Sequence, residues 1–108
     1  MQARQVKEEF PRIEQYIDKA AQLSKSSSNV PDELRSSLSE LEREADQAKS
    51  ILAQEQNDDR IVDCVDHLEE LGDRAMQACK QAGNIDDQMR QAVQQAHGAL
   101  SELKHSLH

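Results

Sequence analysis

The chain has 108 residues and a formal net charge of −8, with 36% hydrophobic, 31% charged and 2% aromatic residues. This mix is too apolar for a disordered chain, and three glycines and two prolines are too few for the many turns of a sheet fold. The negative charge opposes binding to nucleic-acid backbones or to anionic membranes, which require a basic surface. We therefore expect one all-α domain over residues 1–108, with no nucleic-acid or membrane partner.

The chain shows no sign of secretion or membrane insertion. No apolar signal segment follows Met1, and no stretch reaches the roughly 18–20 apolar residues of a membrane span. Cys64 and Cys79 fall on one predicted helix, about 22 Å apart. A disulfide needs Cα atoms within about 7 Å, so we expect two free thiols and a cytoplasmic location.

The first predicted helix covers about residues 4–24. Its apolar residues recur at helical steps of four and three, at Val6, Phe10, Ile13, Ile17 and Ala20. Pro11 interrupts this pattern because proline lacks a backbone donor and disfavours helical angles at the preceding residue. The helix therefore either starts at Pro11 or kinks there.

A serine-rich loop over residues 24–29 precedes the second helix, predicted over 31–55. Pro31, Asp32 and Glu33 form a strong start signal, because proline suits the first turn and acids complement the helix dipole. The apolar positions again step by four and three, at Leu34, Leu38, Leu41, Ala45, Ala48 and Leu52. This regular stripe predicts a helix with one buried side.

The third and fourth helices are predicted over 58–82 and 85–107. Asn57 or Asp58 is a natural N-cap for the third, and Gly83 with Asn84 resembles a left-handed C-cap. Asp86 and Asp87 supply the acids that favour a new helix start. The buried stripes are predicted at Ile61, Val65, Leu68, Gly72, Ala75, Cys79 and Ala82, and at Met89, Val93, Ala96, Leu100, Leu103 and Leu107.

Short loops make successive helices antiparallel, so the sequence predicts an up-down-up-down four-helix bundle with coiled-coil-like packing. Gly72 lies on a buried stripe and marks either a close helix crossing or a tolerated small residue. Many buried positions are alanine, which buries little apolar area. Both a monomer and a homodimer are therefore open.

Negative charge is concentrated in the middle of the chain. Residues 31–56 and residues 57–82 each carry seven acidic and three basic residues, a net charge of −4. This acidity forms either a solvated outer surface or a docking face for a basic protein partner. The residues that we assign to such a face are Glu40, Glu44, Asp63, Asp66, Glu70 and Asp73.

No pattern in the sequence indicates a cofactor, a metal centre or a catalytic set. The sequence does not carry the two Glu-x-x-His motifs, one on each of two helices, that a di-metal bundle needs. Asp63 and His67 have the spacing of a metal-ligand pair, but His67 is expected on the solvent side beside Leu68. His97 is likewise expected to face outward beside Ala96. We assign no catalytic, cofactor-binding or metal-binding residues.

The leading hypothesis is a non-catalytic helical interaction module, such as a small adaptor, a chaperone-like protein or a regulatory subunit. The alternative is an acidic inhibitor or antitoxin-like protein that covers a basic partner. A third hypothesis starts from Arg60 and His67, which bracket six residues. This spacing resembles the Arg-x(4–6)-His motif of HEPN-type helical nucleases, and the resemblance implies a small helical nuclease. The same hypothesis includes a metal-binding protein that uses Arg60 and His67.

Overall fold

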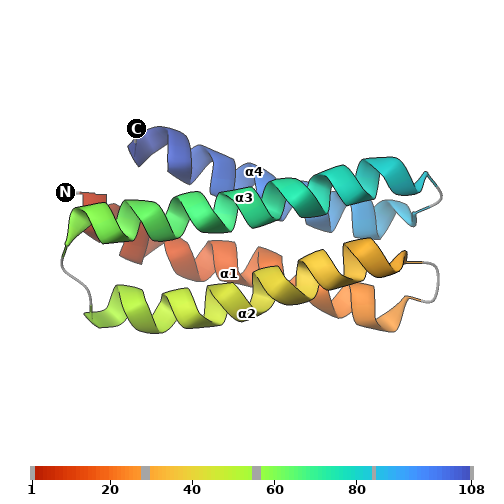
Figure 1. The fold of residues 1–108 in the computed structure, drawn as a ribbon, viewed down its shortest axis with the longest axis horizontal. Coiled ribbons are helices and arrows are strands. Elements are labelled where there is room, and N and C mark those ends of the chain that lie inside the picture. The colour runs from red at the N-terminus through yellow and green to blue at the C-terminus, as the bar shows by residue number, and fades with distance from the viewer. Residues whose placement is uncertain (1, 28–29, 55–56, 84, 108) are drawn as a thin grey trace.

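The computed structural model describes residues 2–27, 30–54, 57–83 and 85–107. These residues form four helices, α1 (Gln2–Ser26), α2 (Asp32–Gln54), α3 (Asp58–Ala82) and α4 (Asp87–Leu107). Each helix packs against the next, and α4 also packs against α1, so the four helices form a closed ring (Figure 1). Successive helices run in opposite directions along a bundle of 42 × 22 × 18 Å. The predicted antiparallel four-helix bundle is confirmed.

Helix α1 passes through Pro11 without ending. It begins at Gln2, and both Val6 and Phe10 are buried before the proline is reached. Pro11 itself is exposed, so its ring faces solvent. The alternative in which the first helix starts at Pro11 is therefore wrong, because the apolar stripe from Val6 onward keeps its register across the proline.

The predicted helix ends lie close to the observed ones, and the capping residues explain them. Asn57 caps α3, and its side-chain oxygen accepts a hydrogen bond of 2.9 Å from the Asp59 N–H. Gly83 follows the last residue of α3 with φ of 74°, a left-handed value that glycine adopts readily. The predicted roles of Asn84 and the predicted helix end at residue 55 lie outside the described residues.

The core is built from the predicted apolar stripes, which lie in the centre of the bundle. Leucine, isoleucine, valine and alanine fill it, and Phe10 is the buried aromatic residue among those described. Tyr16 on α1 is partly buried and packs against the part of the core that contains Phe10. A core with so few rings forms thin contacts between helices, consistent with the many alanines at buried positions.

Both cysteines are free thiols, as predicted, with Cys64 half-buried and Cys79 buried. Among the described residues, no helix is both long and apolar enough to span a membrane.

Candidate functional site

Helices α3 and α4 approach closely at Gly72, which is buried in their interface. A Cβ atom at this position would lie only 3.1 Å from Cδ1 of Leu100 and 3.7 Å from Cδ2 of His97. A contact of 3.1 Å is shorter than ordinary van der Waals contact between carbon atoms. Gly72 therefore marks the close helix crossing that was one of the two interpretations of the sequence.

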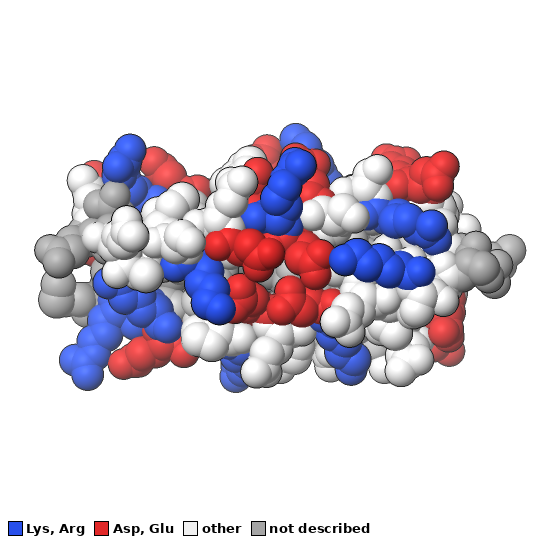
Figure 2. Space-filling view, turned by 90° about the horizontal axis from the view of Figure 1, so that it is seen from below, with Lys and Arg blue, Asp and Glu red and all other residues white. Residues whose placement is uncertain are grey.

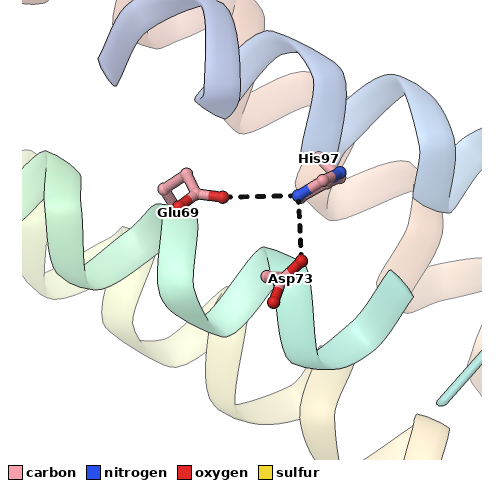
Figure 3. A group of neighbouring side chains, drawn as sticks. All are labelled: Glu69, Asp73 and His97. Atoms are coloured by element: carbon pink, nitrogen blue, oxygen red, sulfur yellow. Dashed lines mark ion pairs between the residues drawn. The ribbon is translucent and has the colours of Figure 1, made fainter. Parts of the chain in front are cut away.

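The close approach brings His97 of α4 between two carboxylates of α3 (Figure 3). Its Nε2 atom lies 3.3 Å from Oε2 of Glu69 and 3.6 Å from Oδ1 of Asp73. Glu69 and Asp73 are four residues apart, so they lie one turn apart on the same side of α3. The three ligand-type atoms all lie within 4.8 Å of one another, and this is the one such group among the described residues.

Glu69 is shared between two partners on α4. Its Oε2 atom faces His97, and its Oε1 atom accepts a hydrogen bond of 3.2 Å from Nζ of Lys104. This hydrogen bond and the charge of Glu69 raise the pKa of Lys104, and the more distant Asp66 and Glu70 act in the same direction. The side chain of Glu69 is only 15% exposed, so α4 holds the carboxylate from both sides.

This region differs from what the sequence predicts. The expectation that His97 faces outward is wrong, because its side chain is only 24% exposed and lies in the α3–α4 interface. The sequence gives no specific role to Glu69, and it places Asp73 only on an acidic docking face. The available signal was a pair of acids four residues apart around Gly72, but the sequence did not show which side of α4 they meet.

A hollow lies between α2 and α3, and we call it the α2–α3 groove. It has a volume of about 580 Å³, and its lining includes Glu44, Ala48, Ile51, Asp63, Cys64 and His67. Ile51 is 46% exposed, which makes it the one exposed large hydrophobic residue among those described. The groove thus combines an apolar side chain with acidic side chains.

His67 lies in this groove and remains on the surface, as predicted. Its side chain is 53% exposed, and its Nε2 atom lies 3.7 Å from Oε2 of Glu44. Burial raises the pKa of the Cys64 thiol, and the nearby charge of Glu44 raises it further. A thiol with a raised pKa is less ionised at neutral pH and is therefore a weaker nucleophile.

The six acidic residues proposed as a docking face are distributed over different parts of the surface. Glu44 and Asp63 both line the α2–α3 groove, whereas Asp73 contacts His97 at the α3–α4 interface. Asp66 and Glu70 act electrostatically on Lys104 of α4. Glu40 lies in a shallow hollow lined by α2 alone. The α2–α3 groove therefore brings together two of the six, along with Arg60 and His67.

A third group of acids lies between α1 and α2. Figure 2 shows acidic side chains gathered near the middle of the face seen from below the view of Figure 1, with basic side chains on either side. Burial raises the pKa of Asp18, and the charges of Glu42 and Asp46 raise it further, while Lys49 and Lys25 act in the opposite direction. Lys25 pairs with Glu42 at 3.2 Å, so this cluster is partly neutralised by its own lysines.

Comparison with models of protein families, with curated proteins and with solved structures found no match to this chain.

Proposed function

We propose that the protein is a non-catalytic helical interaction module, and that the α2–α3 groove binds a basic amphipathic segment of a partner protein. The observation that carries this proposal is Ile51, a large apolar side chain exposed inside a groove. A single exposed isoleucine on a flat surface needs no partner. In a groove beside buried Ala48 and Leu68, it offers the anchoring contact that an amphipathic helix makes with its apolar side.

Charge supports a basic partner. Glu44 and Asp63 lie in the groove, and residues 31–56 and residues 57–82 each carry a net charge of −4. Lysine or arginine residues flanking the apolar side of a bound helix would meet these carboxylates. Such complementarity speeds association and selects the partner more than it strengthens binding, and salt weakens it.

Affinity capture from a native extract tests the proposal with three forms of the chain: wild type, Ile51→Gln and the control Gln94→Ala. Ile51 and Gln94 are both exposed, so neither substitution disturbs the core. We expect the wild type and the control to capture the same basic protein, and Ile51→Gln to lose it. Equal capture by Ile51→Gln would overturn the groove as the binding site.

The alternative of an acidic inhibitor or antitoxin-like protein differs in which surface meets the partner. It requires broad electrostatic contact instead of an apolar anchor. Capture that survives Ile51→Gln and disappears as salt is raised would favour this alternative.

The nuclease hypothesis has one specific observation in its favour, because Arg60 and His67 line the same groove. The carboxylates of Glu44 and Asp63 beside them repel a phosphate backbone, which opposes RNA binding. Incubation of a single-stranded RNA with the wild type and with His67→Ala distinguishes a nuclease from a non-catalytic module. We expect no hydrolysis by either form, whereas hydrolysis by the wild type alone would establish a nuclease.

A further inference from the structure

Glu69, Asp73 and His97 form a group of side chains that has no role in the proposed binding of a partner to the α2–α3 groove. Two helices contribute to it, and Gly72 provides the space in which His97 lies next to the backbone of α3. Glu69 and Asp73 precede and follow Gly72 on α3, so the carboxylates lie on both sides of the imidazole. The group is thus held by the packing of the bundle, and not by flexible surface side chains alone.

Its distances fit a small cation with tetrahedral coordination. Zn–N and Zn–O bonds of 2.0–2.2 Å at tetrahedral angles place neighbouring ligand atoms about 3.4 Å apart. Nε2 of His97 lies 3.3 Å from Oε2 of Glu69 and 3.6 Å from Oδ1 of Asp73. Two edges of the coordination polyhedron are therefore already in place. The remaining edge, between the two carboxylates, is at most 4.8 Å and closes by a small movement of the more exposed Asp73.

The donor set indicates which cations fit. One imidazole and two carboxylates suit borderline divalent metals such as Zn²⁺, whereas Mg²⁺ and Ca²⁺ prefer oxygen ligands alone. The two carboxylates balance the charge of a divalent ion. Three protein ligands leave a further coordination position for water, and Asp73 is 52% exposed, so the ion can enter from solvent.

Lys104 supports this arrangement instead of blocking it. It hydrogen-bonds Oε1 of Glu69, while the oxygen that faces His97 is Oε2. A cation bound through Oε2 leaves the Lys104 hydrogen bond intact. Such partners beyond the ligands orient a carboxylate and are part of most metal sites.

The same distances also fit a protonated His97 that forms ion pairs with both carboxylates and binds no metal. The two arrangements differ in what occupies the space facing Nε2, a proton in one and a metal ion in the other. They therefore make opposite predictions for the addition of metal.

We propose that Glu69, Asp73 and His97 form a binding site for a borderline divalent transition-metal ion, for which Zn²⁺ is the probe. The proposal is independent of the partner groove, since it uses the opposite side of α3. Zn²⁺ bound there links α3 to α4 and stabilises the folded chain, as does any ligand that binds only the native state.

Titration of the full chain with Zn²⁺, by calorimetry and by NMR of the histidine ring signals, tests the site. We expect His97→Gln and Asp73→Asn each to weaken Zn²⁺ binding by about tenfold or more. The matched control is His67→Gln, because His67 faces one carboxylate where His97 faces two. The control should change the affinity less than about twofold, and the His97 ring signals should be the first to shift.

Co²⁺ provides a second readout that does not depend on the variants. Cobalt bound by nitrogen and oxygen gives weak visible bands, whereas a thiolate ligand gives strong charge-transfer absorption. We expect only the weak bands. Overturning results are equal Zn²⁺ affinity of the wild type and His97→Gln, tight binding of Mg²⁺ or Ca²⁺ at this group, or thiolate absorption that assigns the metal to Cys64 or Cys79.

Discussion

The α3–α4 and α2–α3 interfaces each contain one histidine opposite carboxylates, yet the two histidines have different surroundings. His97 is 24% exposed and has two carboxylates within 3.6 Å, whereas His67 is 53% exposed and has Glu44 at 3.7 Å. At the first interface, Gly72 lets a histidine lie against the opposite backbone. At the second, side chains such as Ile51 and Cys64 line an open groove. A single missing Cβ thus distinguishes an interface that encloses polar groups from one that exposes them.

The substitution Gly72→Leu should remove this difference, and it has the largest expected effect. The new side chain must occupy space held by Leu100, which is fully buried, and by His97. We expect the free energy of unfolding to fall by about 2–3 kcal/mol, as is typical of overpacking. Urea unfolding followed by circular dichroism measures this change.

Gly98→Leu is the matched control, because Gly98 lies in α4 at an exposed position, where an added Cβ would meet no atom of another helix within 4 Å. Here the substitution only improves helix propensity, so we expect stabilisation by about 0.5–1 kcal/mol. Equal effects of the two substitutions would show that the close crossing at Gly72 has no energetic consequence.

The reactivity of Cys64 tests the electrostatic contact across the open α2–α3 groove. Burial raises the pKa of this thiol, and the charge of Glu44 raises it further. Glu44→Gln removes the second cause, so it should lower the pKa and increase the thiolate fraction at pH 8. We expect alkylation by iodoacetamide to become roughly two- to threefold faster. Cys79 is the internal control, since Glu44 is not among the groups that shift its pKa. Unchanged alkylation of Cys64 would contradict the electrostatic contact across the groove.

The smallest expected effect concerns the α1–α2 interface, where acids face one another without a histidine. The pKa of Asp18 is raised above its ordinary value of 3.8, first by burial and then by Glu42 and Asp46. The folded state therefore favours the protonated carboxyl, and this contribution is present below pH 3.8 and is lost as the pH rises through the folded pKa. Ionised Asp18 then reduces stability at pH 7.

Asp18→Asn should accordingly stabilise the chain at pH 7 by a few tenths of a kcal/mol, a small effect because Asp18 is only partly buried and solvent still screens its charge. The gain should shrink in high salt and vanish near pH 3. Thermal unfolding of the two forms at both pH values measures it. A larger gain at pH 3 than at pH 7 would contradict a raised pKa of Asp18 in the folded chain.

The fold was predictable because several local signals agree. Asn57 and Gly83 cap α3 where the apolar stripe begins and ends, and the stripe of α2 is buried at every predicted position from Leu34 to Leu52. The sequence could not show whether the first helix starts before Pro11 or at it, because a solvent-facing proline within a helix and a proline at a helix start share the same local pattern. The burial of Val6 and Phe10 in the bundle shows that the helix starts before Pro11.

The α3–α4 group was not predictable in the same way. The spacing of Glu69 and Asp73 places them on one side of α3, but their partner on α4 depends on how the two helices are rotated and offset. That offset follows from the contact of Gly72 with Leu100, a tertiary contact between residues 28 positions apart. Periodicity shows which side of a helix is apolar, and it does not show which polar residues at the edge of that side will meet.

Tyr16 has a practical consequence for solution work. The chain has no tryptophan and one tyrosine, so intrinsic fluorescence comes from a single residue of α1 packed against the core. Circular dichroism reports all four helices together, whereas tyrosine emission reports the docking of the first. Coincident melting curves from the two signals indicate that the bundle unfolds as one unit. An earlier transition in the emission would reveal that α1 separates before the other three helices unfold.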